Sequence, residues 1–377
     1  EGNNFINGAS TIYFDAVSRR RIYNSIDSAN LNRSQLLKKE YQNLKYKLGR
    51  IPTLKEFDDH GELDPLRIIQ YSKSYHNFLK KYDPEYSVEF TPEQEGILEF
   101  ISYRFASGMR IHELSLLKFL ICSPDLIDLW EDHLLNTYGV AIDDLCRASI
   151  RNVLSNKFFR SMKVSPNLID TEVEGFKASP QLVEAIKDET FKDALLAVNN
   201  FGIYRYQLNY SNNYKGTQFN LNKKYTYTDV CWLLNWKVEE VSLNIGGYKY
   251  DKYTNTYPVF INYDKSEEVS ASIRYEDRFV DQSRLIAISK SQRTIASDDV
   301  DNAIHAEERH ILMPLFVRKN KDDKTSKEFY FLGTIKHNGH LQEFIMPDTD
   351  KSAVEIGYHL NTPVENNLYE YITERTI

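Results

Sequence analysis

The spacing of apolar residues changes near residue 203, and no other feature of this sequence constrains the fold as strongly. Before that point apolar side chains recur every three or four residues, as at Leu36, Leu37, Tyr41, Leu44 and Leu48, which is the period of an α-helix. After it, short alternating runs are separated by turn-forming clusters, which is typical of strands. The sequence therefore predicts the α+β class, with an all-helical N-terminal region followed by a β-barrel domain with one or two helices.

The same change predicts three regions along the chain. Residues 1–30 hold one possible strand and one basic helical piece, which is too little to fold alone, so we expect the tail of a preceding domain cut from a longer protein. Residues 31–202 are predicted to form a helical connector domain, and residues 203–377 the β-rich domain. The last helix of the connector is expected to end within residues 199–202, Asn-Asn-Phe-Gly, because Asn and Gly often follow helix ends.

Several local signals set the expected ends of individual elements. Gly49 should follow one helix, and Thr91 followed by Pro92 should begin another, because Thr caps helices and Pro suits their first turn. A short helix is predicted at residues 228–234, capped by Thr228 or Asp229. Strands are predicted at residues 217–221, 258–263, 310–317, 328–332 and 353–360, with a turn at His337-Asn338-Gly339.

Overall composition does not indicate a catalytic or membrane-bound chain. The sequence lacks the Gly-x-x-x-x-Gly-Lys-Ser/Thr loop of ATP sites, His-Glu-x-x-His, Gly-x-Ser-x-Gly and the His-x-Lys pair of phospholipase D nucleases. The three cysteines are far apart and fit a reducing cytosol, and Cys122 and Cys146 are expected to be buried. No apolar run reaches the roughly 18 residues of a membrane span. We expect no catalytic residue, metal or cofactor in this chain, and no membrane contact.

Charge and aromatic content give a local hint of nucleic-acid binding. The net charge of −7 is not that of a typical nucleic-acid-binding protein. Residues 201–260, however, carry seven Lys and Arg against four Asp and Glu, together with ten of the 26 tyrosines. Positive charge interleaved with aromatic rings is typical of nucleic-acid contacts. A tyrosine-rich β-domain with a solvated face explains this composition equally well.

One motif has the parts needed to hold a flat polar ring. Residues 246–251 read Gly-Gly-Tyr-Lys-Tyr-Asp, and residues 260–266 read Phe-Ile-Asn-Tyr-Asp-Lys-Ser. Tyrosines offer faces for stacking and an aspartate can accept from the ring edge, which suits a nucleobase extruded from a duplex. Two tyrosines acting as a clamp should face each other across roughly 7 Å, twice a stacking contact distance. The alternative is a β-hairpin whose tyrosines pack on the barrel.

Further polar side chains are candidates for contacts with the DNA backbone or flanking bases. They lie directly after the second tyrosine and in two later segments that carry Lys, Arg, Ser and Gln. A solvated strand face is an equal alternative for them. The candidates are Lys265, Ser266, Arg274, Arg278, Ser289, Lys290, Gln292 and Arg293.

The order of these motifs resembles a known family. Lys224-Tyr225-Thr226-Tyr227, Leu233-Leu234-Asn235-Trp236, the segment at 246–266, Ser289-Lys290-Ser291-Gln292-Arg293 and Phe329-Tyr330-Phe331-Leu332-Gly333 are similar to the C-terminal region of bacterial type IV restriction enzymes. Those enzymes, including staphylococcal ones, join a phospholipase-D-type nuclease to a helicase. The resemblance implies ATP-dependent cleavage of DNA containing 5-methylcytosine or 5-hydroxymethylcytosine in the bacterial cytoplasm. ATP and a divalent metal would belong to the nuclease and helicase domains, which would be partners of this chain.

Within that region, Gly-Gly-Tyr-x-x-Asp followed by Phe-x-Asn-Tyr resembles the base-binding core of SET-and-RING-associated (SRA) domains, which have a PUA-like barrel. The resemblance implies that Tyr248 and Tyr263 sandwich a flipped base, that Asp251 accepts from its amine, and that Gly247 belongs to the pocket. Asn262 and Asp264 stand where those domains have Thr, so the side that contacts the methyl group departs from the family pattern.

These observations predict a target recognition domain that binds methylated double-stranded DNA. Two other functions remain open. The chain could be an interaction module that couples the helicase motor to its nuclease, with DNA contact incidental, or it could bind RNA, as other PUA-like barrels do.

Overall fold

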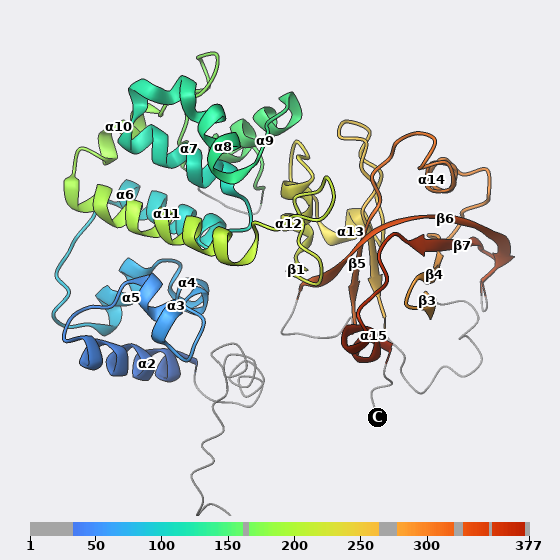
Figure 1. Cartoon of the computed structure of the whole chain (residues 1–377), viewed down its shortest axis with the longest axis horizontal. Helices are drawn as coiled ribbons and strands as arrows, with labels where there is room; N and C mark the ends of the chain where they lie inside the picture. Colours follow the sequence, from blue (N-terminus) through green and yellow to red (C-terminus); the bar gives the residue numbers. More distant parts are fainter. Residues whose placement is uncertain (1–32, 161–165, 264–276, 320–326, 347–348, 374–377) are drawn as a thin grey trace, which may run out of the picture. The chain divides into compact units, whose positions relative to one another are not determined.

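A computed structural model describes residues 33–160, 166–263, 277–319, 327–346 and 349–373 (Figure 1). The chain divides into two compact units. The first comprises Glu1–Ile127, Val164–Pro166 and Ala178–Asn209, and the second Asp128–Lys163, Asn167–Lys177 and Tyr210–Ile377. The architecture is mixed α+β, which confirms the predicted class. The predicted domain tail at residues 1–30 lies outside the described residues.

The regular elements of the first unit are helices. The helices α2 to α5 enclose a small core formed by Leu37, Tyr41, Leu44, Phe57, Leu63, Ile68, Phe78 and Leu79. Gly49 directly follows α2, and Thr91 caps α6 through a capping box with Gln94, as the sequence predicts. The bounds of the helices are α2 (Arg33–Leu48), α3 (Leu54–His60), α4 (Leu66–Ser72), α5 (Tyr75–Tyr82), α6 (Pro92–Phe105), α7 (Ile111–Cys122), α10 (Pro180–Ala185) and α11 (Glu189–Asn209).

The long helix α11 corrects one predicted boundary. It continues past residues 199–202 without interruption and ends at Asn209. Gly202 is inside the helix because of packing: a Cβ atom there would lie 2.7 Å from a methyl carbon of Leu114 and 2.7 Å from the carbonyl oxygen of Phe105. Asn199 is buried and donates to the carbonyl oxygen of Leu114 (2.9 Å). The two residue types that predicted a helix end therefore serve a close contact with α6 and α7.

The second unit contains the strands. Its helical elements are α8 (Trp130–Tyr138), α9 (Asp144–Leu154), α12 (Tyr227–Leu233), α13 (Ser242–Ile245), α14 (Asp298–Ile304) and α15 (Asn366–Thr373), and the 3-10 helix η1 (Pro124–Leu129) precedes α8. Its strands are β1 (Lys224–Tyr225), β2 (Val259–Asn262), β3 (Arg278–Asp281), β4 (Arg284–Ile288), β5 (Pro314–Arg318), β6 (Phe329–Ile345) and β7 (Ser352–Leu360).

The strands form one curled sheet in the order β2-β5-β6-β7-β4-β3, and β1 pairs with β6. In the described part of the chain the outer strands β2 and β3 are not paired with each other, so the sheet is a half-barrel instead of a closed barrel. The pair β2–β5 is parallel, whereas the other pairs of named strands are antiparallel.

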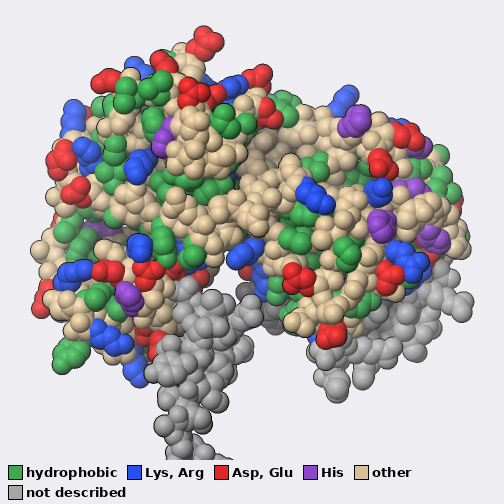
Figure 2. All heavy atoms as spheres, in the orientation of Figure 1, with side chains coloured by type: hydrophobic (Ala, Val, Ile, Leu, Met, Phe, Trp, Pro, Cys, Tyr) green, Lys and Arg blue, Asp and Glu red, His purple; other side chains and the backbone are tan. Residues whose placement is uncertain are grey.

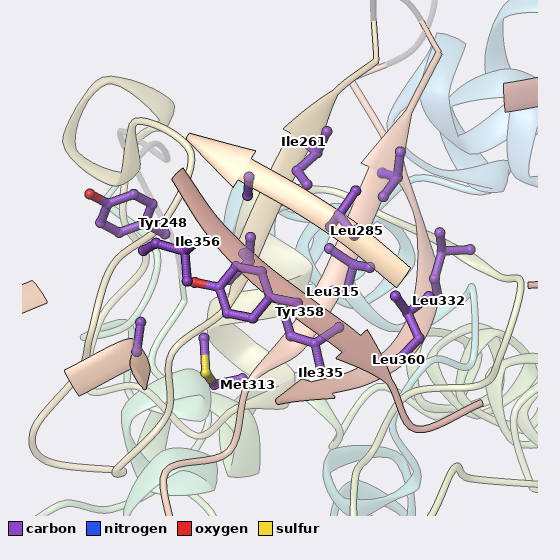
Figure 3. Packing of buried hydrophobic residues seen from close by; sticks show 14 of the residues in the cluster. Tyr248, Ile261, Leu285, Met313, Leu315, Leu332, Ile335, Ile356, Tyr358 and Leu360 are labelled. Atoms are coloured by element: carbon purple, nitrogen blue, oxygen red, sulfur yellow. The ribbon is translucent and has the colours of Figure 1, made fainter. Parts of the chain in front are cut away.

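Alternating side chains of β2 and β5 serve two different cores. Ile261 and Leu315 belong to the large apolar cluster shown in Figure 3, which also includes Met313, Ile335 and Ile356. Phe260 and Phe316 point to the opposite face of the sheet and stack at 5.0 Å. Both faces of the sheet are therefore covered at β2, the strand that carries Val259–Asn262 of the motif.

One predicted strand, one predicted turn and one predicted helix need correction. Residues 217–221 form a turn in which the Thr217 hydroxyl donates to the carbonyl oxygen of Tyr214 (2.6 Å). The predicted turn at residues 337–339 is an irregularity inside β6, where the register with β7 shifts between His337 and Leu341. The short helix predicted at 228–234 is α12, which begins one residue earlier and is capped by Thr226. The strands β3 and β4 have no predicted counterpart.

The surface and the cysteines add three findings. Cys146 and Cys231 are buried, but Cys122 is exposed, so the prediction for that thiol is wrong.

On the face in Figure 2, acidic and basic side chains of the described residues are interspersed instead of gathered in one field. Among the helices of the described residues, none combines the length and apolar character that a membrane crossing requires.

Candidate nucleic-acid interface

Tyr248 is positioned by a glycine turn that follows α13. Gly246 and Gly247 have φ values of +52° and +96°, and the left-handed region is accessible to Gly at little cost. The turn brings the carbonyl oxygen of Gly247 to the N–H of Phe260 (2.6 Å) and Tyr248 into a bridge with Val259, the first residue of β2. The glycines are therefore required by the backbone conformation that places Tyr248 against the sheet.

The Tyr248 side chain is buried but keeps a polar end. Its ring stacks on Tyr257 with centroids 5.5 Å apart and planes 15° from parallel. Its hydroxyl donates to Oδ2 of Asp299 (3.0 Å) and accepts from the backbone N–H of Lys290 (2.9 Å). In Figure 3 Tyr248 is at the margin of the apolar cluster, and its hydroxyl points away from the other labelled side chains. One end of this residue is thus part of the core and the other is available to a neighbouring pocket.

That pocket has a volume of about 590 Å³, which is within the range of small-molecule sites. It is formed by the turn at α13, the segment after β4 and the start of α14. Among its lining residues, Lys249, Lys290 and Arg293 are basic and Asp298 and Asp299 are acidic. The other lining residues are Asn244, Tyr248, Tyr250, Ala296 and Ser297.

The charges in the pocket are unequally compensated. Arg293 donates from Nε to Oδ2 of Asp299 (2.7 Å), and this hydrogen bond raises the pKa of Arg293. Lys249 is paired with Glu240. Lys290 has no carboxylate within ion-pair distance among the described residues; its Nζ lies 4.7 Å from the ring centroid of Tyr248. Burial lowers the pKa of Lys290 and raises the pKa of Tyr248. The pocket therefore contains one half-buried ammonium group that is held over an aromatic ring instead of a carboxylate.

The structure separates the two tyrosines of the predicted clamp. Tyr263 follows the last residue of β2, so it is four residues along the chain from Val259, or about 13 Å at about 3.3 Å per residue. Its buried ring packs against Phe279 with centroids 5.6 Å apart. In the described part of the chain the two rings are not paired, because Tyr257 and Phe279 take those positions, and Tyr263 is not among the residues that line the pocket.

Asp251 and Asn262 have local partners. Asp251 Oδ2 accepts from the backbone N–H (2.9 Å) and the hydroxyl (2.6 Å) of Thr254, which stabilises a turn. Its Oδ1 has no hydrogen-bond partner within the described ranges. Asn262 Oδ1 accepts from Nε of Arg318. The roles of these residues and of Tyr263 in base binding stay predictions, as does that of Asp264, which lies outside the described residues.

The candidate backbone contacts fall into four groups. Lys290 and Arg293 line the pocket, as described above. Arg278 forms an ion pair with Glu355 (3.1 Å), and the buried Ser289 hydroxyl accepts from the backbone N–H of Val354 (2.9 Å). Gln292 is exposed and has a φ of +63°. The remaining three, Lys265, Ser266 and Arg274, lie outside the described residues.

Sequence reasoning missed Asp299 and Tyr257, which organise the pocket. Asp299 binds both Tyr248 and Arg293 through one carboxylate oxygen, and the Tyr257 hydroxyl donates to its backbone carbonyl (3.0 Å). The one sequence signal was Ser297-Asp298-Asp299, a capping residue followed by two acidic residues at the start of a helix. That signal locates the start of α14 but does not reveal that Asp299 contacts a motif fifty-one positions earlier.

Two family models match this chain. A model described as a domain of unknown function (DUF3427) matches residues 219–372, and another, also described as a domain of unknown function (DUF8090), matches residues 37–209. The division between the two matches agrees with the end of α11 at Asn209. No curated protein matches the chain.

Two solved structures that resemble parts of the chain are crystal structures of KRYPTONITE. One is in complex with mCHH DNA, an H3(1-15) peptide and SAH, with 8% identity and a TM-score of 0.27. The other is in complex with mCHG DNA and SAH, with 7% identity and a TM-score of 0.26. Each match covers 39% of this chain and 33% of the solved chain, so it spans about a third of the length of those proteins. At these TM-scores the similarity is too low to assign a function.

Proposed function

We propose that this chain binds double-stranded DNA that contains a modified cytosine and that an extruded base enters the pocket beside Tyr248. The observation that carries the proposal is the location of Tyr248. This first tyrosine of the Gly-Gly-Tyr-x-x-Asp motif lines a pocket of about 590 Å³ that also contains Lys249, Lys290 and Arg293. An aromatic ring beside Lys290, the pocket cation without a carboxylate partner among the described residues, suits a base and its phosphate.

The free-energy cost of extruding a base and the gain from stacking it are of similar size. Extruding a base costs a few kcal/mol, and stacking on an aromatic side chain returns roughly 1–3 kcal/mol per base. Phosphate contacts by the basic residues would supply the remainder. Burying one methyl group adds only about 1 kcal/mol. We therefore expect a moderate preference for methylated over unmodified DNA.

Lys290 would move when a base binds. Tyr257 occupies one face of the Tyr248 ring, and the ammonium group of Lys290 lies over the ring at 4.7 Å. A base can stack there only if this flexible side chain swings aside. The released ammonium could then bind a phosphate of the extruded nucleotide, which would offset the lost contact with the ring.

The other motif residues have roles that the motif alone suggests, because neither Asp251 nor Asn262 lines this pocket. Asp251 would accept from the exocyclic amine of cytosine through Oδ1, which has no partner in the described part of the chain and which thymine would not satisfy. Contact of Asn262 and Asp264 with the modified side of the base stays a prediction from the motif, since Asn262 is at the far end of β2 from Val259. We further propose that the chain is the specificity part of a type IV restriction enzyme, with ATP, divalent metal and DNA cleavage in separate nuclease and helicase domains.

The test compares duplexes that differ by one methyl group. The affinity of the whole chain for a fluorescent duplex with 5-methylcytosine is measured by anisotropy against the same duplex with cytosine. We expect several-fold tighter binding of the methylated duplex, and a rise in the fluorescence of 2-aminopurine placed opposite the modified base when that base is extruded.

Equal affinity for the two duplexes, or tighter binding of single-stranded RNA than of either, would refute the proposal. The first result would favour an interaction module that couples motor and nuclease, and the second an RNA-binding barrel. Asp251→Ala should weaken binding of the methylated duplex, and wild-type affinity of that variant would remove Asp251 from the site.

A further inference from the structure

Basic side chains that have no carboxylate partner among the described residues gather at one end of the sheet, away from the pocket beside Tyr248. Because β2 and β5 are parallel, both end there, at Asn262 and Arg318. β6 is antiparallel to β5 and begins at the same end, where Tyr330 pairs with Val317 of β5 and with Lys224 of β1. The end of α15 packs at the same place, because Tyr371 contacts Tyr330.

Four side chains there form a continuous row, which we call the lysine–tyrosine cluster: Lys224, Tyr330, Tyr371 and Lys319. The Nζ atom of Lys224 lies 4.7 Å from the ring centroid of Tyr330. The rings of Tyr330 and Tyr371 are 6.2 Å apart, and Nζ of Lys319 lies 4.9 Å from the centroid of Tyr371. Each end of the tyrosine pair is thus covered by an ammonium group.

The positive charge of the cluster is not neutralised within the described ranges. Among the described residues neither Lys224 nor Lys319 has a carboxylate within 4 Å, in contrast to Lys249 and Lys336, which pair with Glu240 and Glu307. Glu328 interacts electrostatically with Lys224, and burial raises the pKa of that carboxyl, which weakens it as a counter-charge. An aromatic ring orients an ammonium group but does not cancel its charge.

The exposure of the cluster suits a large partner. Tyr371 is 46% exposed, and both lysines are partly exposed. Arg318, at the end of β5, adds a third cation without a carboxylate partner in the described part, with its guanidinium 4.5 Å from the centroid of Phe329. Separate cations spread over a sheet end match a row of phosphates better than a single small anion, and tyrosines between them add stacking and hydroxyl contacts.

We propose that the lysine–tyrosine cluster is a contact for a nucleic-acid backbone, separate from the pocket beside Tyr248. Lys224 and Lys319 each neutralise one phosphate, without reading sequence or methylation. This inference rests on the proposed function in one respect only, which is that the nucleic acid is duplex DNA. Asn262 and Tyr263, which belong to the base-binding motif, lie at the same end of the sheet, so one duplex can contact both features.

The experiment measures the salt dependence of binding. For wild type and Lys224→Gln/Lys319→Gln, affinities for methylated and unmodified duplexes are determined between 50 and 200 mM salt. Each phosphate contact contributes about 0.9 to the slope of log affinity against log salt for B-DNA. We therefore expect the double variant to lose about 1.8 of the slope on both duplexes, with an unchanged ratio of methylated to unmodified affinity.

Lys336→Gln is the matched control, because it removes the same type of charge from β6 but from a lysine that pairs with Glu307 (3.4 Å). Its slope should stay at the wild-type value. A double variant with the wild-type slope, or with no larger change per lysine than the control, would overturn the inference. If wild type binds both duplexes equally and the slope still falls in the double variant, the inference stands and the proposed function fails. If the methyl preference holds and the slope is unchanged, only the inference fails.

Discussion

The Tyr248 side chain allows its hydroxyl and its ring to be tested separately. In Tyr248→Phe the ring remains, but the Lys290 N–H loses the acceptor at 2.9 Å and Asp299 loses one donor at 3.0 Å. Asp299 keeps its hydrogen bond from Arg293, so the main loss is the acceptor of a half-buried N–H group. Such losses cost about 1–2 kcal/mol. For a unit of this size that corresponds to a decrease in Tm of about 2–8 °C.

The same substitution should have little effect on DNA. If Tyr248 contributes a stacking face, Tyr248→Phe should bind the methylated duplex within about threefold of wild type. Tyr248→Leu retains apolar bulk in the core but removes the aromatic face, so the loss of roughly 1–3 kcal/mol of stacking should weaken binding about 5-fold to 150-fold.

Tyr257→Phe is the matched control for these variants. Its hydroxyl donates to the backbone carbonyl of Asp299 (3.0 Å), but Tyr257 does not line the pocket. It should lower Tm by a similar amount and leave DNA affinity unchanged. Thermal melts and anisotropy titrations on the same samples give both quantities. If Tyr248→Phe loses tenfold in affinity, about 1.4 kcal/mol, while its Tm is unchanged, the hydroxyl contacts DNA. That result would refute the conclusion that the hydroxyl serves only to stabilise the fold.

Two further predictions concern stability. Burial raises the pKa of several tyrosines, so their folded-state pKa exceeds the unfolded value near 10. Their contribution to the stability of the fold is therefore complete below about pH 10 and is lost as pH rises above it. The loss is up to about 1.4 kcal/mol per pH unit for each group. Urea midpoints that stay constant from pH 9 to 11 would contradict this for Tyr41, Tyr75, Tyr225, Tyr248, Tyr257 and Tyr358. Gly108→Ala and Gly49→Ala both place a side chain at a positive φ (+77° and +68°), which costs about 1–2 kcal/mol. Of the two, only Gly108→Ala would also bring the new Cβ within 2.4 Å of a backbone atom, the nitrogen of Tyr206. Gly108→Ala should therefore be more destabilising by a further 1–3 kcal/mol or so, and equal urea midpoints for the two variants would show that α11 can move to make room.

Periodicity and caps predicted the elements whose signals are local. The start of α6 follows from Thr91-Pro92, and the centres of β2, β5 and β7 follow from alternation. The hairpin β3–β4 escaped notice because its two-residue turn, Gln282-Ser283, has no Gly or Asn; instead the Asp281 side chain accepts from the N–H of Ser283 (2.8 Å). Such a turn is selected by side-chain hydrogen bonds that a composition pattern does not display.

The candidate site was predicted only in part, because the contacts that were missed depend on tertiary packing. The motif located Tyr248, and the segment after β4 supplied Lys290 and Arg293 to the same pocket. The expected pairing of Tyr248 with Tyr263 did not allow for Tyr257, whose ring takes the stacking position. Asp299 was missed because its contact with Tyr248 depends on how α14 packs against the turn, which is a tertiary property.

The parallel pairing of β2 with β5 has a consequence for the order of folding. Antiparallel neighbours such as β3 and β4 can pair through a two-residue turn, whereas β2 and β5 are separated by about fifty residues of chain and can pair only when the two strands have been brought together. Pairing across such a long segment carries a larger loop-closure entropy than closing a two-residue turn, so we expect β2 to join the sheet late. Tyr248 bridges to β2 at Val259. The pocket beside Tyr248 would then form only in chains that have completed the sheet, so that partly folded molecules, for example during synthesis, would not compete for DNA through it.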